Sequence, residues 1–368
     1  MIYVHVPFCK SFCIYCGFYS ENLSRCGGER AAEEWSRLVR EEASLRKEEI
    51  LSTAKTDTLY IGGGTPSVLP LSVIEDTVSF LKDILGKRED DSFEEFTIEV
   101  NPDDIVKNGK TYLDGLHRIG VNRISMGVQS FDDGILHWMG RRHSSDDVLK
   151  AVGLIRDAGF SNLSIDLISG ISGLTDDIWE DTLSKAVSLA PEHISAYQLS
   201  VEEGSALDDL VSRGGYVEAD ETQCERQYGI LCRCLSQAGY DHYEVSNFCK
   251  QGFRAVHNSA YWKRVPYVGL GPGAHSLYGE RLRKWNSESF PKYSSSSEIL
   301  SEEDLKVETI MLSLRTSDGI PVEDLISLSG EGKVSSLMDE GALVLYGGRI
   351  RIPEKCFFTS DSIIRDLL

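Results

Sequence analysis

The sequence predicts an α/β protein: a partial (β/α)6 TIM-like barrel followed by a small C-terminal winged-helix-like α+β domain. Apolar runs alternate with amphipathic segments through the first 200 residues, which is typical of a parallel sheet with right-handed crossovers. Six such units are too few for a closed eight-fold barrel. Polar side chains gather where the predicted strands end, at the edge where parallel α/β folds build their sites.

Six short apolar runs are the predicted strands, and helical patterns follow five of them within the first 200 residues. We expect the strands at residues 2–6, 58–61, 96–100, 123–127, 163–168 and 193–199. We expect the helices at residues 30–50, 71–85, 110–119, 145–158 and 176–189. In the first helix, one buried face is expected to carry Trp35, Leu38, Val39 and Leu45.

The pattern changes after about residue 205. A helix is expected at 222–238 and a strand from Tyr240, and the serines at 294–297 are typical of a short polar linker. We therefore expect a core at 1–205, a connecting and site-covering region at 206–293 and a small domain at 294–368.

The predicted small domain has three helical patterns, at 303–315, 322–328 and 333–337. Two strands at 342–352 flank Gly347-Gly348, which is a hairpin signal. Helices followed by a hairpin resemble a winged-helix module. Such modules often bind DNA, but this one lacks basic enrichment, so we expect a structural or partner-docking role.

The chain carries 38 basic and 58 acidic residues, a formal charge of −20. This balance disfavours general binding to nucleic acid or to anionic membranes. No apolar run is long enough for a transmembrane segment, and the N-terminus does not resemble a secretory signal. An odd number of cysteines, nine, indicates free thiols in a reducing compartment. We expect a cytoplasmic protein.

Three cysteines, Cys9, Cys13 and Cys16, lie within eight residues at C-x3-C-x2-C spacing. Thiolates this close converge on one metal centre more easily than they form disulfides. A structural zinc site wants four ligands, whereas a 4Fe-4S cluster can use three cysteines and leave one iron open. A zinc-stabilised binding protein is the alternative at this point. The other cysteines are expected to be buried apolar residues or incidental thiols: Cys26, Cys224, Cys232, Cys234, Cys249 and Cys356.

Further motifs accompany these cysteines along the chain. They are Tyr3-x-His-x-Pro-Phe-Cys9, Gly62-Gly-Gly-Thr-Pro66, Ile98-Glu99-x-Asn-Pro102, Asn122-Arg-Ile-Ser-Met-Gly-Val-Gln129-Ser-Phe and Ile165-Asp-Leu. Together they resemble the radical S-adenosylmethionine (SAM) superfamily, in its branch of coproporphyrinogen III oxidase-like proteins. The resemblance runs from the first residues to the C-terminal domain, and it implies a barrel of the radical SAM type.

The resemblance implies that Cys9, Cys13 and Cys16 hold a 4Fe-4S cluster and that SAM chelates its fourth iron. One electron then cleaves SAM to methionine and a 5′-deoxyadenosyl radical. The positions that match SAM contacts are Tyr3, Tyr15, Gly63, Gly64, Thr65, Glu99, Gln129, Arg141, Asp166 and Ser200. In these roles the glycines allow close backbone approach, and Arg141 can meet a carboxylate. Glu99 can neutralise an ammonium group, and Asp166 and Gln129 can hold ribose hydroxyls.

Two functions occur in this branch. The oxygen-independent oxidases decarboxylate two propionates of coproporphyrinogen III by means of the 5′-deoxyadenosyl radical. They typically have a fourth cysteine and an N-terminal extension, whereas this chain has Phe18 at that position and reaches Cys9 almost at once. HemW-type heme chaperones share the short N-terminus and the phenylalanine, although they usually have aspartate where this chain has Gly17.

Those chaperones also carry the motif His-Asn-x-x-Tyr-Trp, present here from His257 to Trp262. Histidine is a common ligand of heme iron, which makes His257 the candidate heme ligand. We therefore expect a chaperone that binds heme and transfers it to hemoproteins, with the oxidase as the alternative. The implied partners are heme or porphyrin, recipient hemoproteins, an electron donor and, at most peripherally, membrane hemoproteins.

Overall fold

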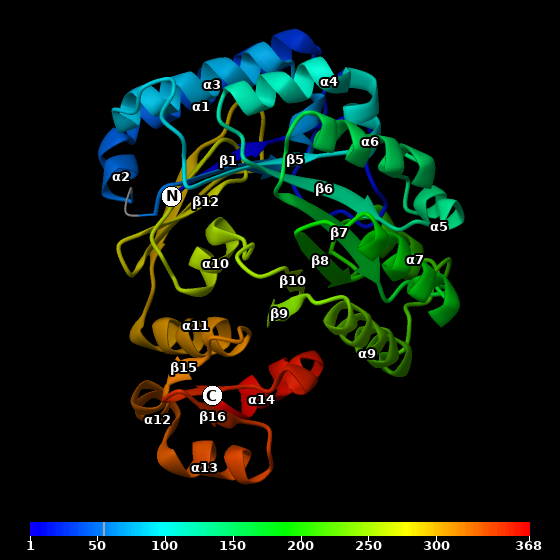
Figure 1. The fold of residues 1–368 in the computed structure, drawn as a ribbon. Coiled ribbons are helices and arrows are strands. Elements are labelled where there is room, and N and C mark those ends of the chain that lie inside the picture. The colour runs from blue at the N-terminus through cyan, green and yellow to red at the C-terminus, as the bar shows by residue number, and fades with distance from the viewer. Residues whose placement is uncertain (54–55) are drawn as a thin grey trace.

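The computed structural model describes residues 1–53 and 56–368 and confirms the predicted α/β class. Its centre is a sheet whose parallel strands stand side by side in chain order (Figure 1). These strands are β1 (Ile2–Val6), β4 (Thr58–Gly63), β5 (Glu95–Val100), β6 (Arg123–Gln129), β7 (Leu163–Ser169) and β8 (His193–Gln198). Each pairs in parallel with the one before it, so the strands form the partial barrel.

Helices follow the strands, and several of them form an arc outside the sheet in Figure 1. They are α1 (Glu29–Leu45), α2 (Lys47–Ser52), α3 (Leu71–Leu85), α4 (Pro102–Arg118), α5 (Asp133–Trp138), α6 (Ser145–Asp157), α7 (Asp176–Ser188), α8 (Ala206–Ser212) and α9 (Glu221–Gln237). Leu59 and Ile61 of β4 face this layer and belong to the large apolar core. Thr58 and Tyr60 alternate with them and face the interior of the barrel, which is polar.

Short strands extend the sheet at both edges. At one edge β11 (Val268–Leu270) pairs in parallel with β1. At the other, β10 (Asn247–Cys249) pairs antiparallel with β8 and with β9 (Asp241–Glu244). A separate sheet contains β12 (His275–Tyr278), β13 (Leu282–Asn286) and β14 (Ser295–Ile299). Near the first strand, β2 (Phe8–Cys9) pairs with β3 (Glu21–Asn22).

Two predictions about helices were wrong. The segment from 30 to 50 is not one helix, because α1 ends at Leu45, whose side chain is 88% exposed instead of buried with Trp35. Helix α4 begins at Pro102, well before residue 110, with proline in the first turn, where its missing N–H costs nothing. Gly109 has left-handed geometry (φ 67°) inside that helix, which interrupts the helical pattern in the sequence.

The predicted serine linker was also wrong. Ser295–Ile299 is strand β14, which pairs antiparallel with β13 although every one of its residues is exposed. An exposed edge strand needs no apolar side chains, because its backbone hydrogen bonds hold it. Hydrogen bonds therefore cross the predicted domain boundary at 294. The domain limits themselves remain predictions.

The C-terminal residues form a small α+β unit around their own apolar cluster, which includes Ile310, Leu314, Leu325 and Phe357. Its elements are α11 (Glu302–Leu314), β15 (Ile320–Pro321), α12 (Val322–Ser329), α13 (Glu331–Asp339), β16 (Val344–Tyr346), β17 (Arg349–Arg351) and α14 (Ser360–Leu367). Strands β16 and β17 form the predicted hairpin, and β15 pairs with β17. Helix α14 has no counterpart in the prediction.

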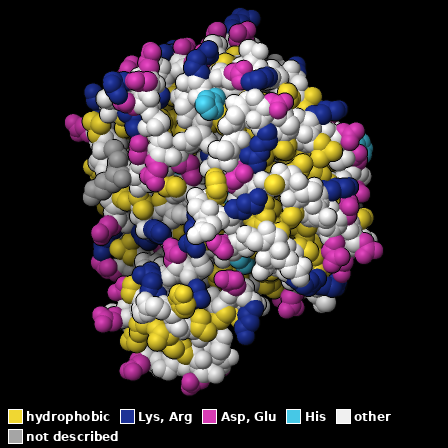
Figure 2. Space-filling view, in the orientation of Figure 1, with side chains coloured by type: hydrophobic (Ala, Val, Ile, Leu, Met, Phe, Trp, Pro, Cys, Tyr) yellow, Lys and Arg dark blue, Asp and Glu magenta, His cyan; other side chains and the backbone are white. Residues whose placement is uncertain are grey.

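The surface is chemically mixed. Figure 2 shows Lys and Arg side chains interspersed with Asp and Glu on the face that it presents. Hydrophobic side chains gather near the bottom of that view, over the C-terminal unit. Within the described residues, none of the helices is both long and apolar enough to cross a membrane.

Glu244 of β9 is a fully buried carboxyl group, and its Oε1 has no hydrogen-bond partner. Burial raises its pKa to about 7. The folded chain therefore keeps this proton at pH values where the unfolded chain releases it, so the stability that Glu244 contributes falls as the pH rises from about 4.5 to 7. Between pH 4 and pH 8, we expect the free energy of unfolding of Glu244→Gln to rise by up to about 3 kcal/mol relative to that of the wild type.

Denaturant unfolding of both proteins across this pH range measures the difference. Glu203→Gln is the matched control, because Glu203 is exposed and its charge needs no desolvation. We expect no pH-dependent difference for the control. If Glu244→Gln and the wild type differ in free energy of unfolding by the same amount at pH 4 and at pH 8, the pKa of Glu244 is not raised by folding.

Candidate functional site

The inner face of the barrel is lined by polar side chains that meet across neighbouring strands. The Tyr60 hydroxyl donates to Glu99 Oε1 at 2.7 Å, joining β4 to β5. The Ser125 hydroxyl donates to Asp166 Oδ1 at 3.4 Å, joining β6 to β7. Tyr197 of β8 is 43% exposed although its strand lies inside the sheet, so the barrel interior is open to solvent on this side. Polar groups with solvent access are suited to binding a polar ligand.

The cysteine motif lies just beyond β1, on a loop that the barrel fixes at several points. The Ile14 amide donates to the Met139 carbonyl at 3.1 Å, and the Leu207 amide donates to the Ile14 carbonyl at 2.7 Å. Cys9, Cys13 and Cys16 are all free thiols and all partly buried. Burial is the main cause that raises the pKa of Cys16 to about 11, and the nearby Cys13 and Cys9 raise it further.

These thiols suit an iron–sulfur cluster by their chemistry, since clusters are held by cysteine sulfur. Among residues 1–53 and 56–368, no three His, Cys, Asp or Glu side chains are arranged as a finished metal site. Arg141 lies beside the loop: Nη1 donates to Cys13 Sγ at 3.4 Å, and the buried Nε has no partner. An orphaned guanidinium N–H next to a thiol is a position where an anionic ligand would be satisfied.

The glycine motif brings the end of β4 against the start of the cysteine loop. The Gly64 amide donates to the Val6 carbonyl at 2.8 Å, and the Thr65 amide donates to the Phe8 carbonyl at 2.7 Å. Thr65 Oγ1 lies 3.4 Å from Cys9 Sγ. Gly63 has φ of 108°, a conformation that only glycine adopts easily. The motif thus sets a tight backbone turn directly beside the first cysteine.

Gly64→Ala tests this close approach. A Cβ atom on Gly64 would lie 2.7 Å from the Phe8 carbonyl oxygen, so the two chain segments would have to separate. We expect the free energy of unfolding to fall by about 1–3 kcal/mol. Gly153→Ala in α6 is the control, because nothing lies within 4 Å of its added methyl group. Denaturant unfolding should show a gain of about 0.5–1 kcal/mol for the control, and a harmless Gly64→Ala would contradict the packing argument.

The carboxyl groups of Glu99 and Asp166 lie inside the barrel beyond this turn. Glu99 Oε2 accepts from the Gly63 amide at 3.1 Å, which ties it to the glycine motif. Burial raises the pKa of Glu99 to about 7 and that of Asp166 to about 6. The nearby Asp166 charge raises the pKa of Glu99 further. Tyr3 stands in the same interior, with its hydroxyl 3.0 Å from His5 Nδ1.

Arg141 connects three parts of this region. Its Nη2 donates at 2.6 Å both to Asn101 Oδ1, after β5, and to the Gly127 carbonyl of β6. Gln129 follows at a register shift in β6 and has an unusual positive φ of 68°. Burial raises the pKa of Tyr15 in the cysteine loop, whereas the nearby Arg141 opposes that rise. The structure therefore brings together most of the predicted rim residues.

Of the remaining predicted residues, Ser200 lies at the edge of this group and His257 lies apart from it. Ser200 is exposed on the loop after β8, where its hydroxyl donates to Glu202 Oε1 at 2.6 Å. Glu202 packs against Gly17 of the cysteine loop, where an added Cβ would lie 2.8 Å from Glu202 Cβ. His257 lies in α10 (Val256–Trp262), next to Thr58 and Glu95 at the beginnings of β4 and β5. The cysteines lie at the opposite ends of the strands.

Both ring nitrogens of His257 also have hydrogen-bond partners. It is 1% exposed, Nδ1 lies 2.8 Å from Thr58 Oγ1, and Nε2 lies 2.9 Å from the Tyr261 hydroxyl. Burial lowers its pKa to about 3. Neither ring nitrogen is free for heme iron in this arrangement, and ligation requires that one of these hydrogen bonds break.

Sequence reasoning did not assign three residues that organise the site. Asn101 joins Arg141 to Thr65, whose Oγ1 accepts from Nδ2 at 3.4 Å. Asp104 is fully buried and pairs with Lys10 of the cysteine loop and, at 3.3 Å, with Arg142. Asn101 stood in a recognised motif and could have been found. Nothing in the spacing of Lys10 and Asp104 indicates that they pair.

A barrel of parallel strands with three free thiols beyond β1 is the arrangement of the radical SAM class. Comparison of the chain with known protein families and relatives agrees with this class. The Radical SAM superfamily matches residues 3–186. The chain is 33% identical over 336 residues to "Heme chaperone HemW" of Bacillus subtilis (strain 168), which covers 86% of this chain and 84% of the relative. It is 30% identical over 377 residues to "Heme chaperone HemW" of Mycobacterium tuberculosis (strain CDC 1551 / Oshkosh), covering 100% of this chain and 94% of the relative.

A solved structure, coproporphyrinogen III oxidase (HemN) from Escherichia coli, superposes on the whole chain and on 89% of its own length with a TM-score of 0.81. At 19% identity this likeness shows the fold alone. The chain belongs to the radical SAM superfamily and, within it, to the family of the heme chaperone HemW.

Proposed function

We propose that Cys9, Cys13 and Cys16 hold a 4Fe-4S cluster with one open iron. Membership of the radical SAM superfamily implies such a cluster together with SAM. The support from this chain is the set of free thiols on one anchored loop, with the Arg141 guanidinium beside Cys13. When bound, the cluster supplies the electron for SAM cleavage.

The residues proposed to hold SAM divide by chemistry. Gly63, Gly64 and Thr65 offer a tight turn where backbone groups can approach a ligand. Glu99 and Asp166 offer carboxylates inside the barrel, and Arg141 offers its unpaired Nε–H to an anionic group. Contacts from Tyr3, Tyr15, Gln129 and Ser200 complete the proposal. Ser200 has the weakest geometric support, because it is exposed and bonded to Glu202.

We infer that the chain binds heme and transfers it to hemoproteins. The observation that carries this inference is similarity to HemW heme chaperones along the entire chain, the C-terminal unit included. Phe18 supports it, because it stands where the oxidases have a fourth cysteine, and it is 72% exposed. The sequence-based assignment of His257 as the heme ligand needs the Thr58 or the Tyr261 hydrogen bond to open.

Oxygen-independent coproporphyrinogen III oxidase is the second candidate. The observation in its favour is the close match in fold to HemN over the whole chain. That reaction would need the same cluster and SAM residues, with the tetrapyrrole substrate at the mouth of the barrel. Apart from Phe18, the cysteine loop and the barrel interior therefore do not separate the two functions.

Anaerobic reconstitution with iron and sulfide, followed by parallel assays, separates them. We expect stoichiometric heme binding and no conversion of coproporphyrinogen III to protoporphyrinogen IX. Conversion would establish the oxidase and overturn the chaperone as the sole function. Iron and sulfide analysis also tests the cluster itself, and a chain that purifies with zinc and takes up neither element would support a zinc-stabilised binding protein.

A further inference from the structure

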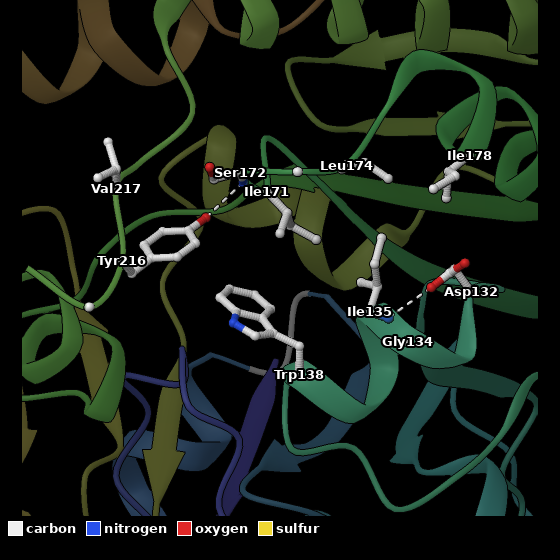
Figure 3. A pocket seen from close by; sticks show the side chains of 12 residues that line it. Asp132, Gly134, Ile135, Trp138, Ile171, Ser172, Leu174, Ile178, Tyr216 and Val217 are labelled. Atoms are coloured by element: carbon white, nitrogen blue, oxygen red, sulfur yellow. Dashed lines mark hydrogen bonds between the residues drawn. The ribbon is translucent and has the colours of Figure 1, made fainter.

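An open cavity of about 550 Å³ lies between helix α5 and the segment that follows β7. Figure 3 shows Trp138 and Ile135 of α5 on one side of it and Ile171, Leu174 and Ile178 on the other. Tyr216 and Val217, from the segment between α8 and α9, border one end. These side chains are aliphatic or aromatic, and Asp132, Ser172 and three glycines complete the lining. The volume falls within the range of about 300–1,000 Å³ that is usual for small-molecule sites.

Two aromatic rings form one wall of the cavity. The centroids of Trp138 and Tyr216 are 5.1 Å apart and their planes are inclined by 31°. The Ser172 amide donates to the Tyr216 hydroxyl at 2.8 Å, which fixes the tyrosine ring across the end of the cavity (Figure 3). The wall is therefore preformed, and an aromatic surface of this kind favours a flat, apolar ligand.

Helix α5 places the cavity next to the proposed cluster. Trp138 is its last residue, and the carbonyl of the next residue, Met139, accepts from the Ile14 amide of the cysteine loop at 3.1 Å. A Cβ atom added to Gly140 would lie 3.3 Å from the Phe12 carbonyl oxygen, so the backbones also touch there. A ligand against Trp138 would thus lie against the same helix that supports the loop.

The charge of the cavity limits what it can bind. No Lys or Arg lines it, and its carboxylate, Asp132, already accepts from the Ile135 amide at 2.8 Å as a helix cap. Anionic groups of a ligand gain no ion pair there, so they would remain at the opening, in water. The recognised part of the ligand must therefore be uncharged, and the Trp138–Tyr216 wall favours a planar one.

We propose that this cavity binds the macrocycle of heme, with the propionates directed to solvent. The proposal rests on the proposed function, which supplies heme as the ligand. It places the macrocycle away from His257, which is buried at the opposite ends of the strands. Contact is made through the ring rather than through an iron ligand, so iron-free protoporphyrin IX should bind at the same place and compete with heme.

Heme titration of the reconstituted full-length chain tests the cavity. Trp138→Ala removes the aromatic wall, and Val217→Glu places a charge at the opening, on a side chain that is 75% exposed and tolerates substitution. We expect each to raise the Kd for heme about tenfold. Ile299→Glu is the matched control, since Ile299 is 77% exposed on β14 and lies outside the cavity. It should leave the Kd unchanged.

The titrations distinguish heme binding by the chain from heme binding in this cavity. If the wild type binds no heme, the proposed function fails. If the wild type binds heme and Val217→Glu binds it with an unchanged Kd, the cavity assignment is wrong while the function stands. Val217→Glu decides this even where Trp138→Ala unfolds, which circular dichroism would reveal. Failure of protoporphyrin IX to compete would likewise overturn recognition through the ring.

Discussion

Cys13→Ala is expected to lose nearly all of the iron and sulfide that reconstitution introduces, together with the visible absorbance of the cluster. A cluster with an open iron has only three cysteine ligands, and two thiolates cannot hold it. The fold should survive, because Cys13 is only partly buried and its Sγ accepts only a weak hydrogen bond from Arg141 Nη1 at 3.4 Å. Elemental analysis, with circular dichroism as the check on folding, measures both effects.

Cys26→Ala is the matched control for this substitution. Cys26 is a free thiol in the same N-terminal region, but it is exposed and outside the C-x3-C-x2-C motif. We expect it to retain the full iron content. Equal iron in the two variants would mean that the motif does not hold the cluster.

His257→Ala is expected to lower the free energy of unfolding by about 2–4 kcal/mol. The substitution leaves the buried Thr58 hydroxyl without the ring nitrogen 2.8 Å away, and it removes the partner of the Tyr261 hydroxyl. Each unsatisfied buried polar group costs about 1–3 kcal/mol, and the lost ring adds a cavity against Tyr60. Denaturant unfolding measures the change.

The histidine control is His137→Ala, an exposed position in α5 where we expect no measurable loss. Heme titration of the same variants adds a second measurement. If His257 acts in folding, His257→Ala keeps its heme affinity under conditions where it remains folded. Loss of heme binding by a fully folded His257→Ala protein would instead support the sequence-based assignment of His257 as the iron ligand.

The sequence predicted the barrel well because long periodic segments carry most of the information about parallel α/β folds. Helix α3 and strand β1 begin and end at the predicted residues. Errors occurred where local chemistry replaced periodicity: at Gly109, where a left-handed residue interrupts α4, and in the serine-rich β14, which only backbone pairing holds. A hydrophobic pattern shows neither a left-handed residue nor a strand held by backbone hydrogen bonds alone.

Only part of the site could be predicted, and that part follows from the order of the strands in the sheet. Strand ends meet at one edge of a parallel sheet, so Glu99 and Thr65 could be placed near the cysteines from strand order alone. Arg141 lies beyond α5 and was assigned only through the family resemblance. The Lys10–Asp104 pair joins residues 94 positions apart, and the Trp138–Tyr216 wall joins a helix end to a distant loop. Such contacts depend on how the connections fold back, which no spacing rule gives.

The position of α10 has a consequence for the order in which ligands enter and leave. The amides of Val256 and His257 donate to Glu95 at the start of β5, so α10 covers that end of the barrel. Tyr243 lies over the start of β8 in the same way, with its hydroxyl 2.8 Å from His193 Nε2. Among the described residues, these contacts cover the beginnings of β5 and β8, whereas Tyr197 of β8 is 43% exposed on the opposite side. A molecule bound inside the barrel would then enter and leave on the side of the cysteine loop, so a second ligand bound beside that loop would slow its exchange.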